Sequence, residues 1–105
     1  MRAGALNRRL AIWRPEEGSD DGAQPVQIWV DVATVWADVR FLNGTESLRA
    51  DAVSAVSKAS IRIRYRTDVS TSMRAFMGGT EFRIVAVLPD EQRRQHVDLV
   101  CEVMA

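Results

Sequence analysis

The chain has 105 residues, a length that predicts one domain over residues 1–105 with a single hydrophobic core. Its 47% hydrophobic and 27% charged residues are ordinary for a globular protein and exclude disordered, collagen-like and coiled-coil classes. Fourteen basic residues balance fourteen acidic ones, whereas a protein that mainly grips a nucleic-acid backbone usually carries net positive charge. We expect neither a membrane span nor a secretory signal, because no apolar run is long enough.

The first half of the chain predicts two strands. Alternation over residues 8–13 indicates a half-buried strand that ends at Pro15, because proline cannot donate to a sheet ladder. Residues 16–25 are polar and rich in Gly and Asp, which predicts a long, mobile hairpin loop. A second strand follows over residues 28–41, with a bend or bulge at residues 31–33.

Residues 45–59 are the only segment with helical character. Asn43-Gly44 indicates a tight turn before it, and Thr45 is a candidate N-cap. The apolar residues at helical spacing form a weak stripe, namely Leu48, Ala52, Ala55, Val56 and Ala59. This pattern leaves two alternatives, a short helix or a loop that becomes ordered on assembly.

The second half predicts a strand over residues 61–66, a hairpin around Gly78-Gly79 and a final strand. The hairpin joins residues 73–77 to residues 80–88. The inward sets are Ile61, Ile63 and Tyr65; then Phe82, Ile84, Ala86 and Leu88; and last Val97, Leu99, Cys101 and Val103. About six strands with one short helix or long mobile loop predict an all-β fold, a small antiparallel barrel or sandwich.

Catalytic and metal-binding patterns are missing from the sequence. His96 and Cys101 lie five residues apart on one predicted strand and therefore on opposite faces, so they cannot pair. Cys101 is expected in the core. The acidic residues of segment 16–25 lack the spacing of a calcium-binding loop. We therefore predict a binding or structural protein without enzymatic activity, metal or cofactor.

Two features suggest an interaction surface. Arg62, Arg64 and Arg66 share the outer face of a predicted strand, where they can meet a partner subunit, nucleic-acid phosphates or carboxylates across the sheet. Trp36 lies opposite the apolar side chains of its strand, so either both strand faces are covered or Trp36 is an exposed interface anchor. Trp13 and Trp29 are expected to fill the core.

Several segments, in this order, resemble the phage head–tail joining family, whose members are also called head-closure or stopper proteins. They are residues 1–4, the strand with Leu10 and Ile12, an acidic loop, residues 29–37, 43–46, 63–68, 73–74 and 79–84. The resemblance covers nearly the whole chain. It implies a structural virion protein whose barrel forms the wall of a homo-oligomeric ring, such as a dodecamer, from subunits that can be monomeric in isolation.

The resemblance also implies a location and partners. The ring would lie at the head–tail connector, after assembly in the host bacterial cytoplasm, between a portal or adaptor ring and tail-completion or tail proteins. It would close the portal channel after DNA packaging, provide the tail attachment surface, and contact passing DNA only transiently and without sequence preference. Residues 43–60 would extend toward the channel, and the candidates there are Asn43, Gly44, Thr45, Glu46, Arg49, Asp51 and Lys58.

Two alternatives stay open at this point. A small barrel of the OB or Sm-like type would bind single-stranded nucleic acid through Arg62, Arg64 and Arg66. A neighbouring tail-completion protein would share the barrel but dock on a different partner.

Overall fold

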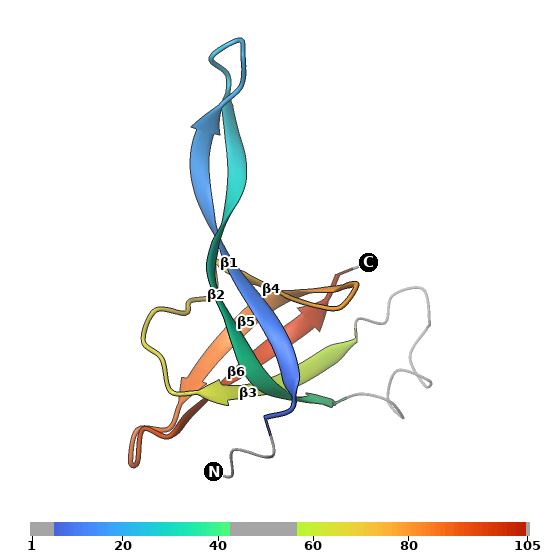
Figure 1. Cartoon of the computed structure of the whole chain (residues 1–105), viewed down its shortest axis with the longest axis vertical. Helices are drawn as coiled ribbons and strands as arrows, with labels where there is room; N and C mark the ends of the chain where they lie inside the picture. The colour runs from blue at the N-terminus through green and yellow to red at the C-terminus, as the bar shows by residue number, and fades with distance from the viewer. Residues whose placement is uncertain (1–5, 43–56, 105) are drawn as a thin grey trace.

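The computed structural model describes residues 6–42 and 57–104, which form six antiparallel strands (Figure 1). The strands close into a barrel in the order β1-β2-β3-β6-β5-β4, with β4 pairing back onto β1. The all-β prediction is therefore confirmed. The strands are β1 (Arg8–Ser19), β2 (Pro25–Phe41), β3 (Lys58–Arg64), β4 (Arg74–Met77), β5 (Thr80–Pro89) and β6 (His96–Val103).

The core fills the inside of the barrel with the alternate apolar residues of every strand. Cys101 is fully buried there, as the sequence predicts. The largest fully buried side chains are Phe82, Leu10, Ile12, Ile61, Ile63, Ile84, Leu99, Val97 and Cys101. Because successive side chains of a strand point to opposite faces, the intervening residues lie on the outside and form the surfaces described below.

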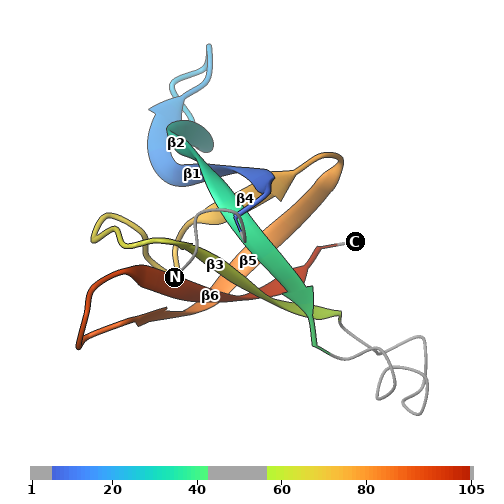
Figure 2. The ribbon, with the colours of Figure 1, turned by 60° about the horizontal axis from the view of Figure 1, so that its bottom comes forward.

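The predicted hairpin between the first two strands is confirmed, but the predicted loop over residues 16–25 is wrong, since β1 continues to Ser19 and β2 begins at Pro25. The two strands pair from Arg8↔Ala37 to Ser19↔Pro25 and project from the barrel as a long ribbon (Figures 1 and 2). Pro15 does not end β1, because past Trp13 this strand has only β2 beside it. A proline is tolerated at such an open strand edge. We call residues 14–19 and 25–30 the ribbon arm.

The turn at the end of the arm is held by one carboxylate. Oδ1 of Asp20 accepts hydrogen bonds from the backbone N–H groups of Gly22 (2.9 Å) and Gln24 (2.8 Å). Ala23 has a φ of 62°, in the left-handed region that a non-glycine residue seldom adopts. The polar residues that suggested a loop therefore make a tight turn between two long strands.

Two bulges change which residues face the core. In β2, Ile12 pairs with Ala33 and Trp13 with Asp31, so Val32 is the extra residue and the predicted bulge at residues 31–33 is confirmed. In β5, Ile84 pairs with Cys101 and Ala86 with Val100, which leaves Val85 unpaired. The alternation reverses there: Val87 packs against the core and Leu88 is exposed, so the predicted common face from Phe82 to Leu88 is wrong beyond Ile84.

The boundaries of β3 also differ from the prediction. The strand begins at Lys58 rather than Ile61, and Ala59, which the sequence places at the end of a helix, is fully buried and pairs with Cys101. The strand ends at Arg64, so Arg66 lies in the following loop. The predicted β4–β5 hairpin is confirmed, with Gly78 at a φ of 61° in its turn.

Candidate interaction surface

Arg62 is the central member of an ion-paired row on the outside of the barrel. It is paired in register with Asp38 of β2 and Asp98 of β6. Its Nε and Nη2 donate to the two carboxylate oxygens of Asp98 at 2.8 and 3.0 Å. This hydrogen bond is the main reason that the pKa of Arg62 is raised. Arg62 therefore pairs with an acid across the sheet, one of the three possibilities predicted from the sequence.

Arg66 is occupied as well, within its own loop. Its Nε and Nη2 donate to the two carboxylate oxygens of Asp68 at 2.9 and 2.8 Å. The hydrogen bond from Arg66 lowers the pKa of Asp68, and the same bond raises the pKa of Arg66. A continuous row of three free guanidinium groups therefore does not exist, which disfavours a phosphate-tracking surface for single-stranded nucleic acid.

Arg64 differs from both neighbours. It is exposed, and within residues 6–42 and 57–104 it has no carboxylate partner. Trp36, which is 50% exposed, lies near it on the outside of β2. The guanidinium carbon of Arg9 sits 4.8 Å from the centre of the Trp36 ring, in cation–π geometry. An exposed Trp36 was one of the two possibilities predicted from the sequence, and the structure confirms it.

Trp36 and Arg64 border a cavity of about 270 Å³ on the outer wall of the barrel, which Val35, Tyr65 and Arg66 also line. Together with Arg9 they define what we call the Trp36 surface, which consists of Arg9, Val35, Trp36, Arg64, Tyr65 and Arg66. It combines apolar area with guanidinium groups, a composition typical of protein interfaces, where Trp, Tyr and Arg are enriched.

Aromatic residues fix the base of the ribbon arm to the barrel. The rings of Trp13 and Phe76 meet edge to face, with centroids 6.0 Å apart. The guanidinium carbon of Arg74 lies 4.6 Å from the centre of the Trp29 ring. Both tryptophans are half-buried at this junction rather than in the core, so the prediction that they fill the core is wrong.

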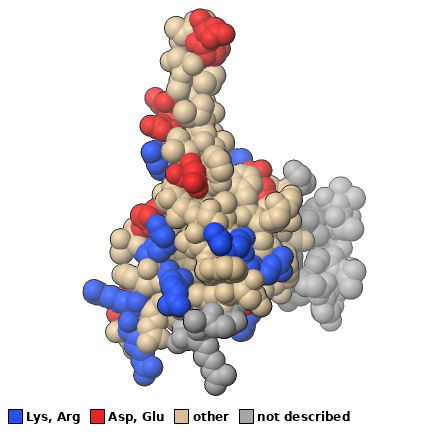
Figure 3. Space-filling view, in the orientation of Figure 1, with Lys and Arg blue, Asp and Glu red and all other residues tan. Residues whose placement is uncertain are grey.

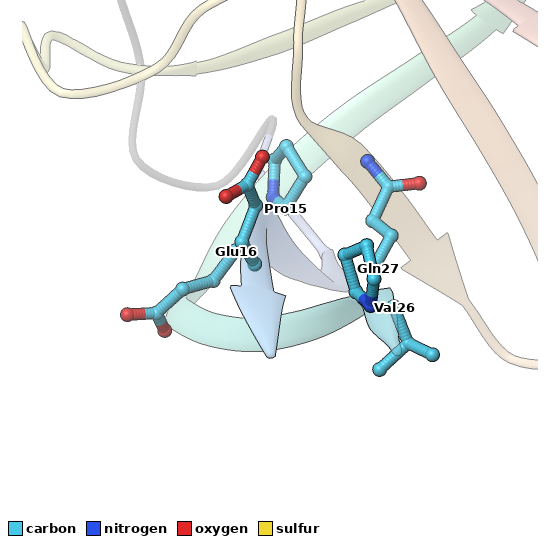
Figure 4. Close-up of a pocket in the computed structure, with 6 residues that line it drawn as sticks. Pro15, Glu16, Val26 and Gln27 are labelled. Carbon is cyan, nitrogen blue, oxygen red and sulfur yellow. The ribbon is translucent and has the colours of Figure 1, made fainter. Parts of the chain in front are cut away.

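The outer part of the arm is a second surface that the sequence prediction missed. A cavity of about 410 Å³ is lined there by both strands, and Figure 4 shows Pro15 and Glu16 of β1 with Val26 and Gln27 of β2. The available signal was the period-two recurrence of Val26, Ile28 and Val30, which continues the strand pattern outward.

Charge separates the arm from the barrel. Figure 3 shows acidic side chains along the arm and at its end, and most of the Lys and Arg side chains of this face over the barrel. The arm and its turn contain four carboxylates, Glu16, Glu17, Asp20 and Asp21, against the one arginine Arg14. The two surfaces are therefore of opposite sign.

Reactive groups do not converge in the described residues. Cys101 is buried, and burial raises the pKa of its thiol to about 12, so it is a poor nucleophile. His96 lies on the outer face, where its Nδ1 is 3.8 Å from Oδ2 of Asp90 and its Nε2 is 3.9 Å from Oδ2 of Asp98. Among residues 6–42 and 57–104, no three His, Cys, Asp or Glu side chains form a group that could hold a metal ion. The part of the chain that the structure describes contains no helix with the length and hydrophobicity needed to span a membrane.

The predicted channel segment lies mainly outside the described residues. Asn43, Gly44, Thr45, Glu46, Arg49 and Asp51 belong to residues 43–56, of which the structure gives no description. Lys58 is described, and it is the exposed first residue of β3 rather than part of a loop. The backbone N–H of Leu42 donates to the carbonyl of Lys58 at 2.9 Å, so the two anchors of the segment lie side by side.

Fold and surfaces together define a small β-barrel protein with exposed surfaces of opposite charge. The comparisons with known proteins agree with this class. The chain matches the family of phage head completion proteins over residues 1–104. It therefore belongs to that family and is a structural protein associated with the phage head.

Solved structures share the fold. The solution structure of protein SF1141 from Shigella flexneri 2a has a TM-score of 0.75 and 27% sequence identity, covering 100% of this chain and 98% of that one. A chain in the virion of a native gene transfer agent particle has a TM-score of 0.66 and 24% identity, covering 95% of this chain and 97% of that one. No curated protein matches the sequence.

Proposed function

We propose that this protein forms a ring at the head–tail connector, where it closes the portal channel after DNA packaging and offers the tail its attachment surface. The observation that carries this proposal is the match to the phage head completion family over nearly the whole chain. A head that has been completed must retain its DNA and accept a tail, and a ring below the portal meets both needs.

Two regions at opposite ends of β2 support an assembly role. The ribbon arm begins at one end of β2, and the anchors of residues 43–56 lie at its other end, next to Phe41. A ring subunit needs contacts with its neighbours and with the components above and below it. In our proposal residues 43–56 face the channel, and the Trp36 surface contacts protein.

The balanced charge of the chain suits a channel that DNA has to pass. Fourteen basic and fourteen acidic residues give no net positive field, so contacts with DNA would be weak and independent of sequence. The portal or adaptor ring and the tail proteins are the proposed partners. Ring formation would follow binding to the portal, so an isolated subunit can be a monomer.

The first test is deletion of the gene in the phage or prophage that encodes it, with electron microscopy of the particles. We expect filled or leaked heads separated from intact free tails, and restoration of joined virions by a plasmid copy. Normal virions from the deletion strain would contradict the proposal. Tails of abnormal length or structure would instead indicate a tail-completion protein.

A second test isolates residues 43–56. The hydrogen bond between Leu42 and Lys58 allows these residues to be replaced by Asn-Gly, which leaves a three-residue hairpin loop ending in Ser57. Ser57 is kept because its carbonyl accepts a hydrogen bond from the N–H of Val103 at 2.8 Å. We expect a folded subunit that enters particles while the heads lose DNA. DNA-filled infectious particles at normal yield would exclude the channel role of this segment.

Arg64→Glu tests the Trp36 surface in the same complementation assay. Because Arg64 has no carboxylate partner in the described residues, reversal should leave the fold intact and reduce the yield of joined virions. Arg93→Glu is the matched control, since Arg93 is exposed in the loop between β5 and β6 and does not line the cavity of this surface. Equal effects of the two reversals would argue against a specific role of the Trp36 surface.

A further inference from the structure

The ribbon arm is a strand pair that lacks a covering partner within the described chain. Strand β4 pairs with β1 only from Ala11 to Trp13, and beyond that point β1 and β2 pair only with each other. An isolated two-stranded ribbon is marginally stable in water and usually needs packing against another element. The arm is therefore the part of the described fold that would gain most from a docking partner.

One face of the arm is suited to docking. Val26 and Ile28 are 37% and 44% exposed and lie on one face together with Val30. A Cβ at position 18 would lie 3.4 Å from Cγ2 of Ile28, an ordinary van der Waals contact, so Gly18 and Ile28 share one face of the arm. The result is an apolar stripe with the carboxylate of Glu16, the register partner of Ile28, on the same face.

The Trp36 surface is complementary to this stripe in both respects. Its cavity offers Val35, Trp36 and Tyr65 for apolar contact, and Arg9 and Arg64 stand beside it with no carboxylate partner in the described part of the chain. A basic surface and an acidic arm attract each other, and opposite potentials determine the orientation of docking.

The arm cannot reach the Trp36 surface of its own chain. Trp36 and Pro25 lie on the same strand, eleven residues apart, which corresponds to about 35 Å at a rise of roughly 3.3 Å per residue. The end of the arm points away from Trp36 along β2, so an arm that docks on this surface has to belong to another molecule. A second copy of the chain supplies the matching arm.

We infer that the ribbon arm of one subunit docks, through its apolar stripe and carboxylates, onto the Trp36 surface of the next copy. The contact is heterologous, because each copy gives its arm and receives another, and repetition around an axis closes a ring. The inference rests on the proposed function, to which it adds the contact between neighbouring subunits.

Cysteine crosslinking in assembled particles tests this contact. Val26→Cys on the stripe face of the arm and Thr34→Cys beside the Trp36 surface change exposed positions and leave the carboxylates, arginines and Trp36 in place. Cys101→Ala removes the native thiol. The two new cysteines of one chain are eight residues apart on β2, about 26 Å, so a short bis-maleimide cannot join them within a subunit.

We expect the double-cysteine chain to give a ladder of dimers, trimers and higher oligomers of this subunit. Particles containing a mixture of the two single-cysteine chains should stop at dimers. Absence of the ladder in particles that contain the subunit would overturn the inference, and so would crosslinking of Val26→Cys to a different virion protein. These results leave the proposed function intact, since that depends on the gene-deletion phenotype.

A charge exchange provides a second readout. Glu16→Arg, on the stripe face opposite Ile28, and Arg64→Glu should each lower the yield of joined virions by about tenfold or more, because like charges then face each other across the contact. The chain carrying both changes should recover most of the yield, since the pair is restored with exchanged signs. Glu91→Arg, in the loop between β5 and β6, is the control. Additive loss in the double variant would overturn the inference.

Discussion

The barrel and the ribbon arm are made from the same two strands but differ in what covers them. Within the barrel, β1 buries Leu10 and Ile12 completely against the other strands. A few residues further along, Val26 and Ile28 of the neighbouring strand are exposed. Strand alternation therefore specifies an extended conformation in both regions, while burial of one face is confined to the region where the sheet closes. This difference separates the part that stabilises the fold from the part available to a partner.

Thiol reactivity gives the largest expected contrast between the two regions. Cys101 is fully buried and the pKa of its thiol is raised to about 12, so it should react only after unfolding. A cysteine at Gln27→Cys in the arm should react as an exposed thiol. For a domain stable by 5 kcal/mol or more, the rates should differ by about a thousandfold or more. Stopped-flow labelling with a thiol reagent at pH 8 measures both rates in one molecule.

The matched variant Gln27→Cys/Cys101→Ala assigns the fast phase to the arm. Rapid labelling of Cys101 in the native protein would mean that the barrel opens locally around β6, which pairs with both β3 and β5 at this residue. A slow phase at Gln27→Cys would mean that the arm is covered in solution.

Side-chain truncation should give the next largest contrast. Leu99→Ala removes a fully buried side chain of the barrel core and is expected to lower the free energy of unfolding by about 2 to 5 kcal/mol. Ile28→Ala in the arm, where the side chain is 44% exposed, should cost less than about 1 kcal/mol. Urea unfolding followed by tryptophan fluorescence and far-UV circular dichroism measures both. Similar losses would show that the arm is part of the cooperative core.

The sequence predicted the barrel well because its strands carry period-two alternation of large apolar residues. The inward set of β6, Val97, Leu99 and Cys101, is fully buried as expected. The bulge at Val85 was not predictable, since one extra residue reverses the alternation without any local composition signal. Leu88 consequently lies outside although its spacing placed it inside.

The arm was misassigned because its composition is that of a loop. Gly, Asp and Pro normally terminate strands, and Pro15 in particular argues against a ladder. In the structure these residues are acceptable because the arm has open edges and no core to fill. For the candidate surface, the exposure of Trp36 followed from alternation, whereas the ion pairs of Arg62 and Arg66 depend on Asp98 and Asp68, whose positions only the register and the loop conformation determine.

The coupling energies of ion pairs should also differ between the barrel and the arm, but by less than the effects above. The bidentate pair of Arg62 and Asp98 lies on the barrel wall, with its closest distance at 2.8 Å. The pair of Arg14 and Glu16 in the arm is at 3.7 Å between exposed side chains. A double-mutant cycle with alanine should give about 1 kcal/mol of coupling for the first pair and close to zero for the second. Equal couplings would show that the barrel wall provides no better geometry than the arm.

The smallest expected effect is the loss of one charge in the loop after β3. The hydrogen bond from Arg66 lowers the pKa of Asp68, so the ionised carboxylate stabilises the folded state. This contribution is complete above the pKa of the unfolded chain, about 3.9, and disappears as the pH falls through the lowered pKa of the folded state. The Asp68 side chain is 50% exposed, which limits the stabilisation to a few tenths of a kcal/mol.

Asp68→Asn should therefore be slightly less stable than the parent protein at pH 6, and the difference should shrink toward pH 3. Urea unfolding midpoints at the two pH values measure it. Asp21→Asn in the turn of the arm is the matched control, because Asp21 has no ion pair within residues 6–42 and 57–104. That variant should match the parent protein at both pH values. A difference for Asp68→Asn that persists unchanged at pH 3 would mean that the side chain stabilises the loop by its shape or hydrogen bonding rather than by its charge.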